Sequence, residues 1–430
     1  MQLSLFTSNE KIAVTRKNGN ANKLDIQDKQ FHDWYRFVLS FPPHLVREYL
    51  GRLGLKNGNT LLDPFCGTGT TVVEAKLHGI SSIGIEANPV AHFASSVKVD
   101  WSVDPQGLLN HANSVANLAH KIIAAENISA PRKLPEEAFS LLLKDSISPL
   151  PLHKSLVLLE QIKKNQQQQY LNHELLALAK ALVFSISNLH FGPEVGVQKT
   201  KKTDAPVVES WLAAIHSMCS DLHAVKNQNI PAIIHNADSR DLAQFLQPQS
   251  IDAVFTSPPY PNEKDYTRTT RLESVILGFI KNKDELRTLK KSLLRSNTRN
   301  VFKGDADDEW VSQHEEIQAI AGSIEKRRID LNKTSGFEKL YGRVTKLYFG
   351  GMARHLATIR PFLKPGAHLC YVVGDQASYF QIMIKTGNIL ADIAKSLGYK
   401  IVGIDLFRTR LATATKKQMR EEVLVLRWDQ

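Results

Sequence analysis

The chain has 430 residues, of which 43% are hydrophobic, and its 54 Lys and Arg against 43 Asp and Glu give a formal net charge of +11. This length allows one large domain with insertions or two to three smaller ones, and the hydrophobic fraction is that of a globular protein with a buried core. The positive charge favours a polyanionic partner, although a basic surface also serves solubility alone.

Cysteines and apolar runs indicate where the protein works. Cys66, Cys219 and Cys370 are far apart and have no metal-binding spacing, which favours a reducing compartment. The apolar run at the start of the chain is too short for a signal peptide, and no run approaches the roughly 18 to 20 residues of a membrane helix. We therefore expect a cytoplasmic protein that makes no membrane contact.

The first half of the chain begins with a polar segment, residues 1–30, which we expect to be a loose arm. Residues 31–50 are amphipathic, and "NTLLDPFCGTGTTVVEAKLHG" at 59–79 predicts a strand, a Gly-rich turn and a helix. Residues 81–91 predict a second strand that ends in an acid. Apolar residues spaced by three and four predict a mostly helical stretch over 102–230.

The second half predicts two more strands, at 231–241 and in "IDAVFTSPPY" at 251–260, followed by a charged, irregular stretch at 261–345. Residues 347–375 predict a helix, a Pro-Gly turn and a strand, and the end of the chain predicts two strands joined by a basic loop. Strands that alternate with helices indicate an α/β fold with a doubly wound, mainly parallel sheet, here with helical and basic insertions.

Two of the predicted strands end in residues suited to binding a ligand, which such sheets hold at the carboxyl ends of their strands. In "DPFCGTGTT", Gly67 and Gly69 allow a tight turn and close approach of a ligand, and Asp63 can face a cationic group. No Gly-Lys-Ser/Thr follows, which excludes a P-loop, and Val72 breaks the dinucleotide-binding pattern. Glu86, 23 residues after Asp63, suits the hydroxyls of a ribose.

These motifs resemble those of a known family. "DPFCGTGTT" resembles the S-adenosylmethionine motif of the amino-methyltransferases of DNA, and "TSPPY" resembles their catalytic Asp/Asn/Ser-Pro-Pro-aromatic motif. "FPPHLV" resembles the segment that folds over the methionine end of the cofactor, and "NADSRDL" resembles the strand end beside the adenine. The resemblance covers roughly 31–100, 231–272 and 346–428, and it implies a Rossmann-like class I methyltransferase fold.

The resemblance also implies roles for individual residues, and no metal. The residues expected to bind S-adenosylmethionine are Phe41, Pro42, Asp63, Phe65, Gly67, Gly69, Thr70, Glu86 and Asp238. The residues expected to hold the reacting base are Ser257, Pro258, Pro259 and Tyr260.

The chemistry of "SPPY" is consistent with this role. Prolines fix φ and remove backbone donors, so the carbonyl of Pro258 and the oxygens of Ser257 can accept the two hydrogens of an exocyclic amino group. Tyr260 can stack on a base, which must first be flipped out of a duplex. We expect direct methyl transfer, because no cysteine follows a proline as a C5 mechanism would require.

Several alternatives remain open on the sequence alone. Ser before Pro-Pro is typical of the family's cytosine-N4 enzymes, whereas its adenine-N6 enzymes usually carry Asp or Asn. An RNA guanine-N2 methyltransferase shares "DPFCGTG", but it normally has Asp in the catalytic loop and an N-terminal RNA-binding domain. A DNA-binding protein that keeps the fold without catalysis is disfavoured, because Asp63, Ser257 and Tyr260 are all intact.

Basic segments are candidates for contacts to DNA. Residues 281–303 hold eight basic residues and two acids. Many relatives of the family place the catalytic motif before the cofactor motif, the reverse of the order in this chain. The motif order therefore does not fix which insert recognises the target sequence. A solvated helix face would explain 281–303 equally simply, and an ion pair of Arg271 with Glu273 would remove that arginine from DNA. The candidate DNA contacts are Arg268, Arg271, Arg295, Arg299, Arg408 and Arg410, with the loop 191–207 as a possible lid.

We divide the chain into an N-terminal arm (1–30), a cofactor-binding half (31–101), a mostly helical insert (102–230), a catalytic region (231–272), a basic insert that is the candidate target-recognition region (273–345) and the C-terminal part of the sheet (346–430). The expected partner is double-stranded DNA. A cognate restriction endonuclease or none is compatible with the sequence, and we expect a monomer.

Overall fold

We analysed a computed structural model of the chain, which describes residues 24–37, 40–126, 129–192, 194–225, 229–262, 264–411 and 418–430. Most of the expected N-terminal arm and the basic loop expected between the last two strands therefore lie outside the described residues. Residues 24–30 are not loose as expected, because Asp28 is buried and accepts a hydrogen bond from Arg47 at 2.7 Å. The packed structure begins before residue 31.

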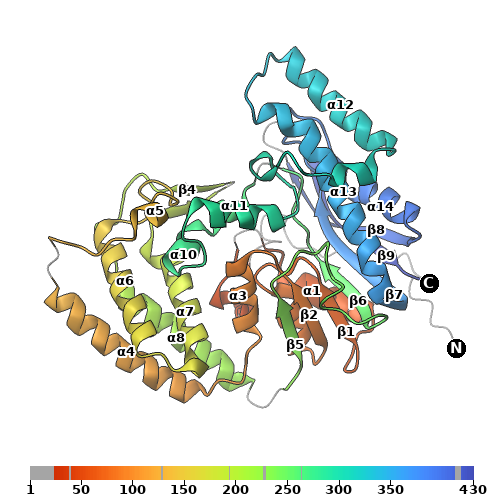
Figure 1. Cartoon of the computed structure of the whole chain (residues 1–430). Coiled ribbons are helices and arrows are strands. Elements are labelled where there is room, and N and C mark those ends of the chain that lie inside the picture. The colour runs from red at the N-terminus through yellow and green to blue at the C-terminus, as the bar shows by residue number, and fades with distance from the viewer. Residues whose placement is uncertain are drawn as a thin grey trace.

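A seven-stranded sheet forms the centre of the molecule (Figure 1). Its strand order is β5-β2-β1-β6-β7-β9-β8; the first five are parallel, and β9 runs antiparallel to both of its neighbours. The strands are β1 (Thr60–Asp63), β2 (Ser81–Ile85), β5 (Ala232–His235), β6 (Ile251–Thr256), β7 (Leu363–Gly374), β8 (Lys400–Leu411) and β9 (Gln418–Arg427). This is the doubly wound, mainly parallel sheet that the sequence predicts.

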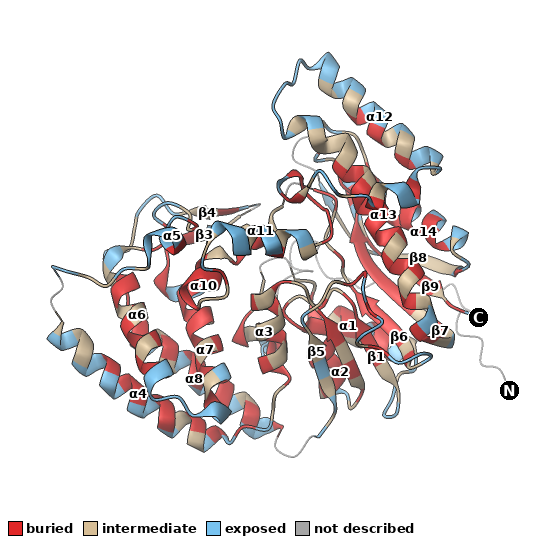
Figure 2. Ribbon diagram, in the orientation of Figure 1, coloured by how far each residue is buried: buried red, intermediate tan, exposed pale blue. Residues whose placement is uncertain are grey.

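Helices cover both faces of the sheet because alternate residues of each strand point to opposite sides. Leu61 on β1 packs with α1 (Pro43–Arg52) and α2 (Thr70–Leu77). Leu62, the next residue, packs instead with α13 (Tyr341–Ile359) and α14 (Thr386–Ser396). The central strands β1, β6 and β7 are accordingly mostly buried (Figure 2), whereas the edge strands β5 and β8 are partly exposed. Burial on both faces explains the nearly continuous apolar sequence of the central strands.

Residues 102–230 are mostly helical, as expected, and form a lobe at one end of the sheet (Figure 1). Its elements are α4 (Pro105–Ala125), α5 (Glu136–Phe139), α6 (Pro149–Lys164), α7 (Gln168–Ala181), a π-helical turn (Leu182–Ile186), the hairpin of β3 (Leu189–Phe191) and β4 (Val195–Val197), and α8 (Val207–Ala224). The lobe shares one apolar core with α2, with α3 (Pro89–Lys98) and with Phe31, Trp34 and Tyr35. Among the described residues, no helix has the length and apolar character needed to cross a bilayer.

The stretch 261–345, expected to be irregular, contains helices: α9 (Tyr266–Thr269), α10 (Arg271–Ile276), α11 (Lys283–Ser292) and α12 (Glu315–Asp330). These helices are rich in charged residues, so apolar periodicity in the sequence does not indicate them. Asn282 caps α11, and α12 begins with acids and ends with Arg327 and Arg328, which complements the helix dipole. Only Leu289 of α11 is buried, so this helix presents mostly charged residues to solvent.

Candidate active site

The turn after β1 is shaped by two glycines with positive φ. Gly67 has φ 54° and Gly69 has φ 88°, values that favour residues without a side chain. A Cβ on Gly69 would lie 3.0 Å from the Cβ of Ser95, so the helix α3 packs directly on this turn. A Cβ on Gly67 would meet no atom within 4 Å, because Gly67 borders a cavity. Gly69 therefore serves packing, whereas Gly67 leaves an open backbone surface for a ligand.

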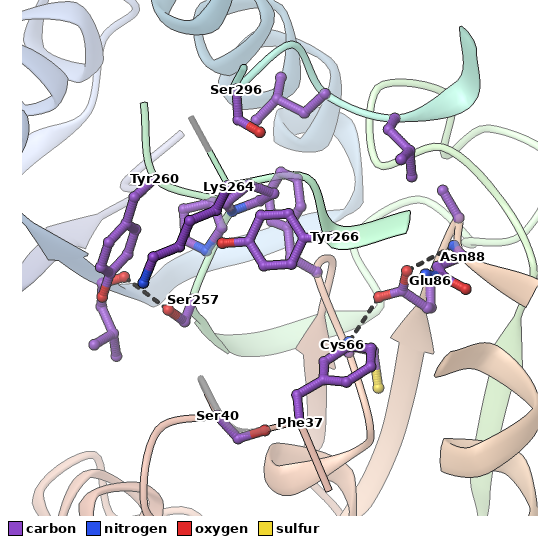
Figure 3. Close-up of a pocket in the computed structure, with 18 of the residues that line it drawn as sticks. Phe37, Ser40, Cys66, Glu86, Asn88, Ser257, Tyr260, Lys264, Tyr266 and Ser296 are labelled. Atoms are coloured by element: carbon purple, nitrogen blue, oxygen red, sulfur yellow. Dashed lines mark hydrogen bonds between the residues drawn. The ribbon is translucent and has the colours of Figure 1, made fainter. Parts of the chain in front are cut away.

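Glu86 directly follows β2 and connects the turn after β1 to the start of α3. Its carboxylate accepts hydrogen bonds from the backbone N–H groups of Gly67 and Asn88, each at 2.7 Å (Figure 3). Burial raises the pKa of Glu86 to about 7, although both hydrogen bonds act to lower it. Each oxygen keeps lone pairs that can accept from a ligand hydroxyl. Glu86 borders the cavity, and its role as a ribose partner stays a prediction.

Asp63 does not border the cavity, which corrects the expectation that its carboxylate faces a cationic ligand. It is fully buried beneath the turn and accepts hydrogen bonds from the hydroxyl of Thr256 at 2.5 Å and from the N–H of Phe65 at 3.2 Å. Its Oδ2 is buried and has no hydrogen-bond partner among the described residues. Burial raises its pKa to about 6. Asp63 thus links the end of β1 to the residue that precedes Ser257.

The remaining predicted cofactor residues divide in the same way. Phe41, Phe65, Gly67, Thr70 and Asp238 border the cavity, whereas Pro42 and Gly69 do not. Asp238 follows β5 and is held by Arg240, whose Nε lies 2.9 Å from Oδ1. The guanidinium of Arg240 is 7% exposed and also pairs with Asp307. A buried arginine therefore fixes the direction of the Asp238 carboxylate.

The "SPPY" loop follows β6 and forms the opposite wall of the same cavity, with all four of its residues at the surface of the cavity. The hydroxyl of Ser257 donates to the carbonyl oxygen of Val372 on β7 at 3.1 Å. This bond uses the only hydrogen of the hydroxyl, so its lone pairs are left to accept. The ring of Tyr260 packs on Gly374, where a Cβ would approach Cε2 to 3.0 Å. A larger residue at 374 would displace the ring.

The cavity that joins these two walls has a volume of about 480 Å³. Cys66 and Glu86 lie on one side, and Ser257 and Tyr260 lie on the other (Figure 3). Gly67, the residue after Cys66, also borders the cavity. The strand order explains this meeting, because β1 is hydrogen bonded between β2 and β6 and all three are parallel. Their carboxyl ends therefore open at one edge of the sheet.

Several known proteins are similar to this chain in sequence. The N6/N4 methyltransferase family model, described as DNA methylase, matches residues 8–95. Type II methyltransferase M.BsoBI of Geobacillus stearothermophilus is 25% identical over 98% of this chain and 87% of its own. M.AvaI of Nostoc sp. is 22% identical over 93% of this chain and 87% of its own length. M.MvaI of Kocuria varians is 21% identical over 85% of this chain and 81% of its own length.

The family model and the type II methyltransferases that match most of the chain support assignment to the S-adenosylmethionine-dependent DNA amino-methyltransferases. Among solved structures, TrmN from Thermus thermophilus matches with 12% identity and a TM-score of 0.27, over 93% of this chain and 52% of that one, a likeness too low to bear on fold or function. The class I methyltransferase fold follows instead from the strand order described above.

S-adenosylmethionine is the methyl donor of this methyltransferase, and the cavity suits it. The open backbone at Gly67 admits a ligand chain, Glu86 offers acceptors for two hydroxyls, and Asp238 offers a carboxylate beyond them. Phe41 borders the cavity beside the turn. A ligand with a cationic centre and a ribose fits a wall that carries these acceptors.

The arginines predicted to contact DNA occupy different environments. Arg408 and Arg410 on β8 border the cavity of the methyltransferase, and Arg408 forms two hydrogen bonds with Glu421, of 2.6 and 2.9 Å. Arg299 is exposed beside α11, outside the cavity lining. Arg268 and Arg271 lie on α9 and α10 and are part-buried.

Two of these predictions require correction. Arg295 is 5% exposed, and its five N–H donors bind Asp305 and the carbonyls of Lys290, Lys291 and Leu293, so it is a structural residue. Arg271 donates to Thr267 and to the carbonyl of Leu141. Arg271 and Glu273 do not form the alternative ion pair either, and the carboxylate of Glu273 accepts a hydrogen bond from the hydroxyl of Tyr35.

Sequence reasoning missed several residues that border the cavity. Lys264 and Tyr266 follow the "SPPY" motif within six residues, and their closeness in sequence was a usable signal. Glu421 lies on β9, more than 150 residues later, and nothing local marks it as a neighbour of Tyr260. From the basic insert, Ser292, Leu293, Leu294, Ser296, Asn297 and Asn300 also border the cavity, whereas the helical insert contributes Glu194.

Proposed function

We propose that the protein is a site-specific DNA methyltransferase that transfers a methyl group from S-adenosylmethionine to the exocyclic N4 of a flipped cytosine in double-stranded DNA. The observation that carries this proposal is the single cavity in which the cofactor turn faces the Ser257–Tyr260 loop. The comparisons support the DNA substrate, because three relatives that match most of the chain are type II methyltransferases. The net charge of +11 is compatible with a polyanionic substrate.

The loop residues would hold the amino group for reaction. Ser257 presents oxygen lone pairs because its hydrogen is engaged by Val372, and Pro258 has a carbonyl but no N–H. Two acceptors of this kind can bind both amino hydrogens and direct the nitrogen lone pair at the cofactor side of the cavity, which is catalysis by positioning. When bound there, S-adenosylmethionine supplies an electrophilic methyl group.

Flipping the base costs a few kcal/mol, and the ring of Tyr260 would return part of it by stacking. Gly374 packs against Cε2 and Cδ2 of that ring, so a side chain at 374 would displace the stacking surface. Burial raises the pKa of Tyr260, which therefore remains a neutral phenol. A neutral ring does not repel the acceptor-rich edge of a pyrimidine.

The choice of cytosine N4 over adenine N6 rests on Ser257. The family's adenine enzymes usually carry Asp or Asn at this position, whereas Thr-Ser-Pro-Pro, as at 256–259, is typical of cytosine-N4 enzymes. We also infer that the basic insert 273–345 reads the target sequence, because its segment 292–300 borders the cavity at several residues.

The test is expression of the chain in a host that lacks DNA methylation, followed by single-molecule sequencing and mass spectrometry of the nucleosides. Ser257→Ala is the matched control, since it removes an acceptor without changing the backbone. The proposal expects N4-methylcytosine at one short motif with the natural chain and little with the control. N6-methyladenine would keep the enzyme class but refute the base. No modified DNA base would refute the DNA substrate and direct the search to RNA, the substrate named for a relative that matches 18% of this chain.

A further inference from the structure

Lys264 is fixed by its backbone at the mouth of the catalytic loop. Its N–H donates to Oδ1 of Asn262 at 3.0 Å, and its carbonyl accepts from Nδ2 of Asn297 at 3.1 Å. The next residue, Asp265, caps α9 and pairs with Lys290 at 3.0 Å. These bonds engage the backbone of Lys264 and leave its side chain to enter the cavity, which Asp265 and Tyr266 also border. In Figure 3 its amino group points toward Ser257 and Tyr260.

The surroundings of this amino group favour its neutral form. Burial is the main cause that lowers the pKa of Lys264, and the positive charge of Arg410 lowers it further, against the opposing effect of Glu421 and Glu194. No ion pair joins Lys264 to any residue in the described part of the chain. The other titratable groups that border the same part of the cavity are Arg408, Tyr260, Tyr266 and Asp265. Burial raises the pKa of both tyrosines, to about 12 for Tyr266, so neither competes as a base near neutral pH.

The reaction proposed above leaves a proton to be removed. The amino nitrogen uses its lone pair to form the new N–C bond, while the S–C bond of the donor breaks and its electron pair stays on sulfur. The nitrogen then carries a positive charge until it loses one hydrogen. Ser257 and the carbonyl of Pro258 can bind that hydrogen, but a neutral hydroxyl or amide oxygen is too weakly basic to keep it.

We propose that the amine of Lys264 accepts this proton from the methylated amino nitrogen and later releases it to solvent. The N–H electron pair returns to the amino nitrogen, and Lys264 becomes an ammonium ion, so atoms and charge balance. A permanent ammonium at this position would oppose both the cationic donor and the developing charge on nitrogen. Its role therefore requires a group that titrates, which arginine at this position would not supply. The inference rests on the proposed amino-group methylation.

The test compares the natural chain with Lys264→Met and Lys264→Arg in single-turnover methylation across pH, with Lys395→Met, an exposed lysine of α14, as the matched control. The natural chain and the control should show a rate that rises with pH and then levels off. Both Lys264 variants should be slower by on the order of 10²-fold at the plateau and should lack that rise. Competitive acetylation of the free enzyme, read by mass spectrometry, should place the Lys264 titration at the midpoint of the rise.

Three outcomes would overturn the inference. The first is that the variants keep the rise of rate with pH at an unchanged midpoint. The second is that the variants are slowed by the same factor at every pH, and the third is that Lys264 titrates far from the midpoint. Each would show that Lys264 does not accept the proton. Calorimetry of cofactor binding verifies that each variant is folded. If Lys264→Met does not fold, the comparison rests on Lys264→Arg. Failure of the proposed function is distinguishable, because the natural chain would then methylate no DNA base.

Discussion

The two walls of the cavity are built in different ways. The cofactor wall consists of backbone in a Gly-rich turn, held by the carboxylate of Glu86, which accepts hydrogen bonds from two backbone N–H groups. The catalytic wall consists of side chains from distant segments, among them Tyr260, Lys264 and the Arg408–Glu421 pair on the β8–β9 hairpin. A wall made of backbone binds a constant ligand, whereas a wall made of side chains can change its substrate without disturbing the sheet.

The largest expected effect concerns Asp63, which lies beneath both walls. Its pKa of about 6 exceeds the ordinary 3.8, so its contribution to stability is fully present below about pH 4 and is lost as the pH rises through 6. The difference corresponds to about 3 kcal/mol. Asp63→Asn cannot ionise, so its Tm relative to the natural chain should rise by several degrees between pH 4 and pH 8.

Differential scanning fluorimetry of both proteins, with the exposed Asp392→Asn as the control, measures this effect. A Tm difference that does not change with pH would mean that burial does not raise the pKa of Asp63. The hydrogen bond from Thr256 to Asp63 would then be the remaining link between the two walls at this residue.

The next effect separates the walls. Tyr260→Ala removes the stacking surface, which is worth about 1–3 kcal/mol, and should lower turnover by about 5- to 150-fold while leaving cofactor affinity unchanged. Tyr260→Phe keeps the ring and should remain near the natural rate. Steady-state kinetics and calorimetry with S-adenosylmethionine give the two numbers. Equal losses of turnover and cofactor affinity would mean that the walls are not independent.

A smaller effect belongs to the cofactor wall alone. Glu86 has a pKa of about 7 because it is buried, and a ligand that brings hydroxyl donors and a positive charge binds its ionised form. Cofactor affinity should therefore rise with pH up to about 7, by at most about tenfold per pH unit. Glu86→Gln should bind more weakly and lose this dependence. Calorimetric titrations between pH 5.5 and 8 test it, and an unchanged slope in the variant would assign the proton to another group.

The contrast between the walls also explains what the sequence could predict. The turn at Gly67 and Gly69, the acid at Glu86 and the Ser257–Tyr260 loop each lie in one short segment, so local pattern and spacing identified them. Arg295 was assigned to DNA because charge alone does not distinguish an exposed arginine from one whose five donors are engaged inside the protein. Glu421 was missed because its approach to Tyr260 depends on how β9 pairs with β7.

The smallest expected effect tests whether the rim of the catalytic wall contacts DNA. Arg410 is 45% exposed at the cavity end of β8, with Glu421 at 3.9 Å as its ion-pair partner. If it neutralises one phosphate, Arg410→Gln should reduce the slope of log affinity against log salt by about 0.9. Arg427→Gln is the matched control, because Arg427 is 43% exposed and forms an ion pair with Asp429. It lies opposite Lys400 in the β8–β9 register, at the other end of the hairpin from Arg410. Fluorescence anisotropy with a labelled duplex at several salt concentrations gives both slopes. Equal slopes in the two variants would place the DNA away from this rim, and the catalytic wall would then owe its arginines to structure rather than to the substrate.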